Sequence, residues 1–533
     1  MNIQSNTRSE NLSLEQALDF ALEQHGNGNL FQAKNLYQQI LKAEPSQPDA
    51  LHLLGVISFQ EGKSKIAIEH IKKALSIKPN FAEAHSNLGN ILRETGQYKD
   101  AILHLQKAIS INRDFADAHN NLGASLHALK RFDDAAKSYK TAFTIKPDFA
   151  EAHYNFGNVM RAIGNVEEVI IHYKKALSAS PDYAEAHYAL GNVMRDMGKL
   201  DEAVTHYERT LTLLPDYVEA LNVLGATQLA QGRLEKALSC FKKIKEVDAE
   251  FPVAFNLGTT LQGLGRFDEA ISSYRLANSP NARAKSLECL YALERYDEFY
   301  LGLEELSLTD KTNIRAAAIS AFASHQLNRA DPYPFCPQPM DFVRMYEGLG
   351  KKTKSTKFNQ QLVDFLKTKT MAWEPAGNTT KKGFQSPSTL FIQPNQLLSD
   401  LEQIIRVQIE AYCSEFCGAG CQFIKLMPRK FSLRGWVVCL LKGGHQAEHI
   451  HTDGWISGVY YLQVPELEGE EEGCIEFGLW GYDYPIVDNN YPRKRFVPQN
   501  SDLVLFPSSL FHRTIPFQAT EERMCIAFDV VPG

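Results

Sequence analysis

Apolar and small residues recur with a 34-residue period through the first half of the chain. Glycines stand at positions 55, 89, 123, 157, 191 and 225, and an alanine or valine follows each by twelve residues. A second small or aliphatic position follows seven residues later, and prolines close most units at positions 79, 147, 181 and 215. Within each unit the apolar residues have helical spacing. The pattern predicts pairs of antiparallel helices, with small residues where two helices approach closely and prolines beyond the second helix.

This 34-residue helix–turn–helix unit resembles the tetratricopeptide repeat, and the resemblance covers residues 13–280. A degenerate unit with Ala33 and Tyr37 begins the array, and a late one contains Gly258. Residues 281–330 look helical but lack the signature, so we expect them to cap the array with a less apolar face. The resemblance implies an α-solenoid whose concave surface binds a protein or peptide.

An asparagine stands two residues before four of the repeat glycines, as Asn87, Asn121, Asn155 and Asn256. This row resembles the asparagine ladder in the repeats of O-linked N-acetylglucosamine transferases, which implies that it grips the backbone of a bound peptide. Amide side chains suit that task because they both donate and accept hydrogen bonds. The row is broken at Ala189 and Val223, and contacts between neighbouring helices explain it equally well.

Histidines recur with the same period, as His85, His119, His153 and His187. Equivalent positions of successive repeats are too far apart to share a metal ion. We therefore interpret these histidines as a repeated packing position on the first helix of each unit.

The hydrophobic pattern changes after residue 330. Residues 331–339, DPYPFCPQP, contain four prolines and begin a predicted linker that reaches residue 357. Beyond it we expect two helices, at 359–368 and 397–416, and six short strands, at 431–441, 456–464, 473–479, 502–506, 512–517 and 523–531. Residues 358–533 are therefore predicted to form an α+β domain of the jelly-roll or cupin kind, and residues 1–12 a polar tail.

Candidate metal ligands gather in the segment HIHTDGWISGVYYL, which begins at His449. Alternate side chains of an extended chain share a face, so we expect His449, His451 and Asp453 to point the same way. Further along, LVLFPSSLFHRTIPF places His512 after a buried strand, and Arg523 begins the last predicted strand.

Two close ligands, a distant histidine and an arginine about ten residues beyond it resemble the Fe(II)- and 2-oxoglutarate-dependent dioxygenases, over residues 336–533. More narrowly, the motifs resemble the bacterial and phage branch related to the prolyl hydroxylases. The resemblance implies a double-stranded β-helix that binds Fe(II) and 2-oxoglutarate, with ascorbate as an optional reductant. It also implies that Arg523 binds the distal carboxylate of 2-oxoglutarate and that Tyr461 hydrogen-bonds it, while Tyr460 packs on the opposite face.

Two ligand sets agree with these motifs. The usual motif of the superfamily, His-x-Asp, selects His451, Asp453 and His512, which is the facial set of two histidines and a carboxylate. The nearer resemblance, His-x-His followed by Ser-Gly-Val-Tyr-Tyr, selects His449, His451 and His512 instead. We favour the three-histidine set and keep Asp453 as the alternative to His449.

Three cysteines recur every four residues, as Cys413, Cys417 and Cys421, and would align on one helix face. Gly418 and Gly420 indicate that the helix ends before Cys421. We predict buried thiols here rather than a metal site.

Composition narrows the picture mainly by exclusion. The 533 residues carry a net charge of -7 at a pI near 6.2, which does not favour nucleic acid as a partner. No apolar run approaches the ~18 residues that a membrane helix needs. Nine cysteines, a sparse and odd number, argue against a disulfide framework and favour the cytoplasm.

We therefore expect an oxygenase that hydroxylates a protein or peptide captured by its own repeats. Two alternatives remain open: an interaction scaffold with an inactive oxygenase domain, and an oxygenase for small molecules or glycans whose repeats serve assembly. The sequence leaves the oligomeric state undetermined.

Overall fold

The computed structural model describes residues 13–349, 356–369, 371–375, 379–392, 394–467, 469 and 471–533. The predicted tail, residues 1–12, and residues 350–355 of the predicted linker lie outside the described residues. The chain divides into two compact units. The first consists of Met1–Val193 with Thr212–Leu214, and the second of Met194–Leu211 with Pro215–Gly533.

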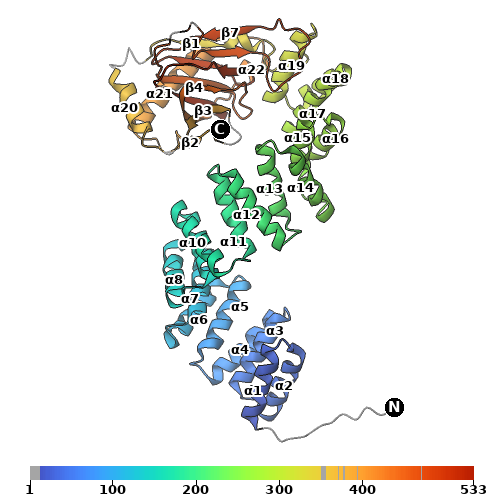
Figure 1. The fold of residues 1–533 in the computed structure, drawn as a ribbon, viewed down its shortest axis with the longest axis vertical. Helices are drawn as coiled ribbons and strands as arrows, with labels where there is room; N and C mark the ends of the chain where they lie inside the picture. The colour runs from blue at the N-terminus through green and yellow to red at the C-terminus, as the bar shows by residue number, and fades with distance from the viewer. Residues whose placement is uncertain are drawn as a thin grey trace. The chain divides into compact units, whose positions relative to one another are not determined.

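Helices fill the chain from residue 14 to residue 326 (blue to yellow-green in Figure 1). Successive helices pair as the 34-residue period predicts, and none of the helices in the described part of the chain has the length and apolar character needed to cross a membrane. Their bounds are α1 Leu14–Gly26, α2 Leu30–Ala43, α3 Pro48–Gln60, α4 Ser64–Ile77, α5 Ala82–Glu94, α6 Tyr98–Ile111, α7 Ala116–Ala128, α8 Phe132–Ile145, α9 Ala150–Ala162, α10 Val166–Ala179, α11 Ala184–Asp196, α12 Leu200–Leu213, α13 Val218–Ala230, α14 Leu234–Val247, α15 Ala254–Gly263, α16 Phe267–Ala277, α17 Pro280–Ala292, α18 Tyr296–Thr309 and α19 Ile314–Gln326.

Each repeat glycine lies where the two helices of a unit come together. A Cβ atom on Gly157 would lie 2.6 Å from Cε1 of Tyr173, and one on Gly123 would lie 2.7 Å from Cε1 of Tyr139. Both tyrosines are fully buried. A large side chain on the second helix therefore covers the bare face of the glycine, which confirms the predicted close approach and explains why no larger residue fits there.

The repeated histidines have the packing role that the sequence predicts. In each, Nε2 lies 3.0 or 3.1 Å from the carbonyl oxygen six residues earlier, in the turn that precedes the helix; the pairs are His85 with Pro79, His119 with Arg113, His153 with Pro147 and His187 with Pro181. The imidazole therefore ties this turn to the first helix of the unit. In the described residues, these histidines take part in no cluster of metal-ligating groups.

The C-terminal part contains two antiparallel sheets, drawn in yellow to red in Figure 1. One has seven strands in the order β1-β8-β5-β10-β4-β3-β2, and the other three in the order β7-β6-β9. Two antiparallel sheets are consistent with the predicted jelly roll. The strands are β1 Arg344–Tyr346, β2 Ala372–Trp373, β3 Thr380–Gln385, β4 Phe431–Gln446, β5 Ile456–Gln463, β6 Ile475–Gly478, β7 Arg493–Phe496, β8 Leu503–Pro507, β9 Phe511–Thr514 and β10 Arg523–Pro532. The helical elements are η1 Pro339–Phe342, α20 Thr356–Leu366, α21 Gln396–Glu415 and α22 Gln422–Lys425.

All six predicted strands are present, whereas β1, β2, β3 and β7 are additional. Strand β10 lies between β4 and β5 and is buried on both faces, so it reads as a nearly continuous apolar run. On one face of the large sheet, Tyr460 donates a hydrogen bond of 3.0 Å to Asn359 of α20. Tyr460 thus has the packing role predicted for it, and Tyr461 faces the other way, where Asp529 of β10 pairs with Ser457 of β5.

The proline-rich segment after α19 is anchored in the core by buried aromatic side chains. Tyr333 and Phe335 are fully buried, and the Tyr333 hydroxyl accepts a hydrogen bond of 2.7 Å from the Asn313 backbone N–H. The Phe335 carbonyl accepts one of 2.7 Å from Phe423 of α22. One hydrophobic core therefore continues from the last helices of the array into the β domain, through the segment that the sequence predicts as a linker.

Candidate metal centre

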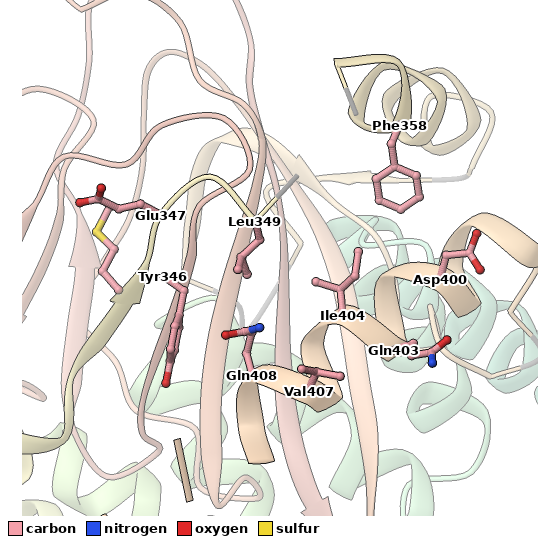
Figure 2. A pocket seen from close by; sticks show the side chains of 10 residues that line it. Tyr346, Glu347, Leu349, Phe358, Asp400, Gln403, Ile404, Val407 and Gln408 are labelled. Carbon is pink, nitrogen blue, oxygen red and sulfur yellow. The ribbon is translucent and has the colours of Figure 1, made fainter. Parts of the chain in front are cut away.

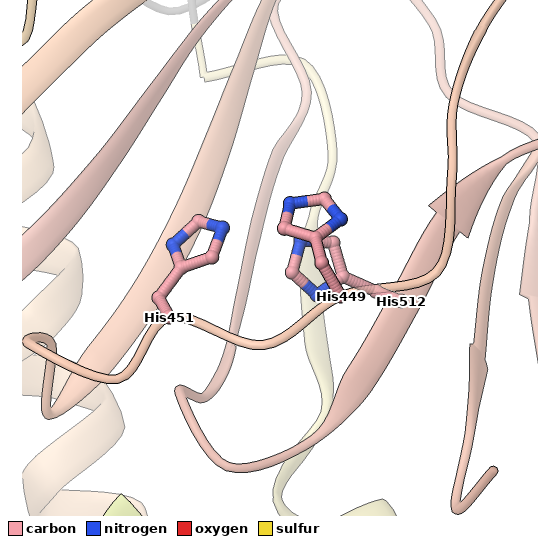
Figure 3. A group of neighbouring side chains, drawn as sticks. All are labelled: His449, His451 and His512. Atoms are coloured by element: carbon pink, nitrogen blue, oxygen red, sulfur yellow. The ribbon is translucent and has the colours of Figure 1, made fainter. Parts of the chain in front are cut away.

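Three histidine side chains converge inside the β domain. His449 and His451 come from the segment between β4 and β5, and His512 comes from β9 (Figure 3). One nitrogen from each of the three lies within 4.8 Å of the others. Within the described residues, this is the sole group of three or more histidine, cysteine or acidic side chains close enough to hold a metal ion.

Backbone pairing brings the two halves of this cluster together. His449 and His512 form an isolated antiparallel bridge in which each N–H donates to the other residue's carbonyl at 3.1 Å. Their neighbours reinforce the bridge, since the guanidinium of Arg513 pairs with Glu448 at 2.6 Å and with Glu476 at 2.7 Å. Because both side chains of a directly opposed pair point to the same face, the bridge places the two imidazoles together, with ring centroids 4.2 Å apart.

Nδ1 of each imidazole is engaged in a hydrogen bond, and within the described part of the chain Nε2 of all three has no hydrogen-bond partner. Nδ1 of His449 lies 2.7 Å from the Ala447 carbonyl, and Nδ1 of His512 lies 3.3 Å from the Leu510 carbonyl. Nδ1 of His451 lies 2.5 Å from the Asp529 carboxylate. Since these acceptors require a proton on Nδ1, the hydrogen-bond network assigns the tautomer in which Nε2 carries a lone pair for a metal.

Asp529 is a candidate site residue that the sequence reasoning missed. Its carboxylate also accepts a hydrogen bond of 2.7 Å from Ser457, and it is 5% exposed. A carboxylate that holds a metal-binding histidine in this way fixes the ring and raises its basicity. The sequence carries a signal for it, because Asp529 is an acid inside the apolar run of β10, on the same strand face as Arg523.

Asp453 is placed differently from the expectation that it shares a face with His449 and His451. The chain is not a strand here: β4 ends at Gln446, and a turn closes with a hydrogen bond of 3.1 Å from the Gly454 N–H to the His451 carbonyl. This turn breaks the alternation, and the Asp453 side chain is exposed, with an ion pair of 3.1 Å to Arg434. Asp453 borders the neighbouring cavity but is not part of the histidine cluster.

Burial keeps two of the imidazoles neutral. It lowers the pKa of His449 to about 3, with a further contribution from the neighbouring His451. Burial also lowers the pKa of His512 well below the usual histidine value, and His449 and His451 add to this effect. Neutral imidazole is the form that binds metals, so neither ring needs to lose a proton near neutral pH.

Arg523 and Tyr461 form a second polar group in the interior. Arg523 is 1% exposed, and its guanidinium lies over the Tyr461 ring at 5.0 Å from the centroid. Among the described residues, neither Arg523 Nε nor the Tyr461 hydroxyl has a hydrogen-bond partner. Burial raises the pKa of Tyr461, so the phenol remains a donor. A buried cation and a buried hydroxyl without partners are costly unless an anionic ligand satisfies them.

A cavity of about 330 Å³ adjoins the histidine cluster. His449, His451 and Trp436 line it, together with Tyr482 from the connection between β6 and β7. The Trp436 ring lies 5.4 Å from that of His451, and its indole N–H is buried without a partner among the described residues. The cavity therefore offers a hydrogen-bond donor and aromatic walls beside two of the candidate ligands.

A larger hollow lies elsewhere in the described part of the chain. A groove of about 870 Å³ between β1, α20 and α21 is lined by residues such as Tyr346, Phe358 and Ile404 (Figure 2). It contains none of the predicted site residues. The groove lies beside the edge strand β1, whereas the histidine cluster borders the smaller cavity.

The four asparagines of the predicted ladder differ in their contacts. Nδ2 of Asn87 lies 2.8 Å from His52, that of Asn155 lies 3.1 Å from Asn120, and that of Asn256 lies 3.4 Å from Asn222. Each of these contacts joins one repeat to the preceding one. For Asn121 the described part of the chain shows no such side-chain hydrogen bond, so its amide is available to a ligand.

The three cysteines at four-residue spacing do not form the buried group that we expected. Helix α21 ends at Glu415, before Cys417 and Cys421, as the two glycines indicate. Cys417 is exposed, and Cys413 and Cys421 are half-buried. The prediction of buried thiols is wrong because the helix ends too early to turn all three toward the core.

Comparisons with known proteins agree with the two parts of the chain. A family described as "Putative 2OG-Fe(II) oxygenase" matches residues 434–529. Tetratricopeptide-repeat families match segments between residues 18 and 279, among them 18–82, 157–198, 182–250 and 252–279. None of the curated proteins compared matches the chain.

Several solved structures resemble its helical part. MamA is 30% identical over 31% of this chain and 96% of its own, with a TM-score of 0.28. A tetratricopeptide repeat protein from Parabacteroides merdae is 19% identical over 46% of this chain and 98% of its own, with a TM-score of 0.37. YrrB, described as having an unusual peptide-binding site, is 18% identical over 36% of this chain and 97% of its own, with a TM-score of 0.30. The chain therefore carries tetratricopeptide repeats followed by a C-terminal domain that matches the 2OG-Fe(II) oxygenase family at residues 434–529.

Proposed function

We propose that this protein is an Fe(II)- and 2-oxoglutarate-dependent oxygenase that hydroxylates a protein or peptide recruited by its repeats. The observation that carries the proposal is the convergence of three imidazoles whose Nδ1 atoms are all engaged in hydrogen bonds, which leaves the Nε2 atoms to bind a metal. A reducing cytoplasm is the setting we propose, because Fe(II) persists there.

The residues present fit the metal. His449, His451 and His512 would bind it through Nε2, and Asp529 would hold His451 in place from behind. A set of three histidines lacks the anionic ligand of the common facial set. The carboxylate of Asp529 supplies part of the missing negative charge through the imidazole that it contacts.

The residues present also fit 2-oxoglutarate. Arg523 would bind its distal carboxylate as a planar bidentate donor, and the Tyr461 hydroxyl would donate a further hydrogen bond. Both groups are buried, and among the described residues Arg523 Nε and the Tyr461 hydroxyl have no hydrogen-bond partner, as expected for a site built around an anion.

When bound, Fe(II) and 2-oxoglutarate supply the chemistry that divides O₂ between a hydroxylated substrate carbon and succinate, with release of CO₂. The protein contributes orientation and exclusion of water. The rings of Phe506 and Phe477 pack around His512, with centroids 4.6 and 6.2 Å from it, and keep the site dry. The Trp436 N–H would orient a polar group of the substrate in the cavity.

The test is succinate formation from 2-oxoglutarate by the full chain with Fe(II) and ascorbate, together with calorimetry of 2-oxoglutarate binding to the Mn(II)-loaded protein. We expect His512→Ala to abolish metal binding and turnover, and Arg523→Met to weaken 2-oxoglutarate binding by at least tenfold with metal binding retained. Arg406→Met is the control, because Arg406 is a half-buried arginine of α21 that pairs with Glu402. Undiminished turnover in His512→Ala would refute the metal assignment.

Recruitment by the repeats is tested at Asn121, whose amide is available to a ligand. With a random peptide library as substrate, Asn121→Ala should raise the peptide concentration needed for half-maximal succinate formation and leave turnover without peptide unchanged. Asn155→Ala is the comparison, because its amide nitrogen already contacts Asn120. Equal behaviour of all three proteins would favour the scaffold or small-substrate alternatives.

A further inference from the structure

We propose that the last helices of the repeat array complete the metal cavity: Arg315, fixed by Glu288, positions Tyr482, which forms a wall of the cavity and braces the histidine segment. Glu288 lies in α17 and Arg315 in α19, whereas Tyr482 lies in the connection between β6 and β7. The inference rests on the proposed function, because it concerns the same metal site.

The anchor is a buried ion pair. Arg315 Nη1 lies 2.9 Å from Glu288 Oε1, and the two side chains are 14% and 3% exposed. The Tyr484 hydroxyl donates a hydrogen bond of 2.9 Å to the same carboxylate oxygen, and Gln262 donates one of 3.3 Å to the other oxygen. A buried carboxylate needs such partners, so Glu288 holds both the array and the β6–β7 connection in one network.

Arg315 passes this constraint to Tyr482. Its guanidinium carbon lies 4.5 Å from the centroid of the Tyr482 ring, in a cation–π contact. On its other side Tyr482 borders the same cavity as Ile450, and its hydroxyl interacts electrostatically with the Ile450 backbone. Ile450 lies between His449 and His451, and these three residues line the cavity together with Tyr482. A continuous set of contacts thus leads from the ion pair to the histidine segment.

The backbone of Tyr482 needs this support. Tyr482 and Asp483 have φ values of 51° and 56°, in the left-handed region that large side chains rarely adopt. The Phe511 ring closes over Gly481, where a Cβ atom would lie 2.1 Å from its Cδ1. Strained backbone of this kind persists only where its surroundings determine it, and it is common at functional sites.

The same helix α19 and its neighbour hold the rest of the connection. The Gln326 side chain receives hydrogen bonds from the N–H groups of Val487 and Asp488 at 2.7 and 2.8 Å and donates one of 2.7 Å to the Asp488 carbonyl. Tyr291 donates one of 3.3 Å to the Pro485 carbonyl. The β6–β7 connection is therefore shaped by the helices of the array, and the wall of the cavity depends on them.

The experiment is titration of the full chain with Co(II), whose absorption reports both affinity and ligand geometry. We expect Arg315→Met and Tyr482→Phe each to weaken Co(II) binding about tenfold and to change the absorption spectrum. A tenfold loss is the lower limit for residues that support metal ligands indirectly. Arg315→Lys keeps the charge without the planar stack and should recover part of the affinity. In a protein that already carries Tyr482→Ala, Arg315→Met should lower Co(II) affinity by less than about threefold, because Arg315 acts through Tyr482.

The matched control is Arg329→Met. Arg329 follows α19, lies over the Tyr300 ring at 5.2 Å and pairs with Asp297, but contacts neither the ion pair nor the cavity wall. If Arg315→Met fails to fold, the double variant Glu288→Gln/Arg315→Met, which removes both charges of the ion pair, replaces it. The inference would be overturned if the losses of Co(II) affinity from Arg315→Met and Tyr482→Ala were additive. It would also be overturned if Arg315→Met lowered the affinity no more than Arg329→Met does. A wild-type chain that binds no Co(II) would instead refute the proposed metal site.

Discussion

The same substitution, aspartate to asparagine, at Asp529 and at Asp453 tests which of the two carboxylates supports metal binding at the histidine cluster. Asp529 is buried and receives hydrogen bonds from His451 and Ser457, whereas Asp453 is exposed and pairs with Arg434. Changing aspartate to asparagine removes the charge and keeps the shape. If the metal is bound by three histidines, Asp529→Asn should weaken it strongly and Asp453→Asn hardly at all.

The magnitudes follow from burial. The His451 and Asp529 side chains are 9% and 8% exposed, and their atoms lie 2.5 Å apart, so solvent screens the charge little. Loss of a supporting carboxylate of this kind costs about 10- to 100-fold in metal affinity, or about 1.4 to 2.7 kcal/mol. The Arg434–Asp453 side chains are 43% and 68% exposed, and a surface pair of this kind contributes about 0 to 1 kcal/mol to stability. Asp453→Asn should therefore change metal affinity less than about threefold.

The assay is competition between the protein and a chromophoric chelator for Co(II), read for wild type and both variants under one buffer condition. Circular dichroism and thermal unfolding of the metal-free proteins show whether each variant is folded. A large loss in Asp453→Asn, with Asp529→Asn close to wild type, would refute the three-histidine assignment and restore the set of two histidines and a carboxylate. Equal small effects would show that Asp529 does not support His451 in the metal-bound state.

Three further predictions concern stability. Gly157→Ala should destabilise the first unit by about 1 to 3 kcal/mol, because the added Cβ would meet the Tyr173 ring. Gly26→Ala should not destabilise it, because there is open space around Gly26. Chemical denaturation of the two variants measures the difference, and equal effects would contradict the packing argument. Burial raises the pKa of Asp331 to about 6, so the folded chain keeps a proton that the unfolded chain loses, and stability should fall by up to about 3 kcal/mol as pH rises from about 4 to 6. Asp331→Asn should remove this decline in calorimetric scans, and an unchanged pH profile would exclude Asp331 as its source. A bound metal at 100 times its Kd should stabilise the second unit by about 2.7 kcal/mol, reversibly with a chelator, and an unfolding temperature indifferent to metal would count against the site.

Much of the architecture can be predicted from the sequence because its causes are local. The 34-residue period fixes which helix positions must be small, and the structure places Tyr139 over Gly123 and Tyr173 over Gly157 at these positions. The six predicted strands are present because each is a short apolar run bounded by turn residues. Strands β1, β2 and β3 and strand β7 escaped prediction because they are short, half-exposed or polar, and their partners rather than their composition make them strands.

The candidate site divides in the same way. The motifs alone identified His449, His451 and His512 as candidates, since two lie in one short segment and the third follows a recognisable buried strand. They could not decide between His449 and Asp453, because a strand pattern assumes that the chain stays extended. The turn after His451 ends that alternation, and the bridge between His449 and His512 depends on strands far apart in sequence.

The sequence by itself determined the period of the repeats, the class of the C-terminal domain and the residue types suited to a metal, because spacing along the chain records helix and strand geometry directly. Only the tertiary structure brought Asp529 behind His451, placed Tyr333 and Phe335 in a shared core, and set Arg315 against Tyr482. Two of these contacts are between residues far apart in the sequence: His451 and Asp529 are 78 positions apart, and Arg315 and Tyr482 are 167 apart. They depend on which elements become neighbours when the core closes, and no local pattern of hydrophobic and polar residues specifies that choice.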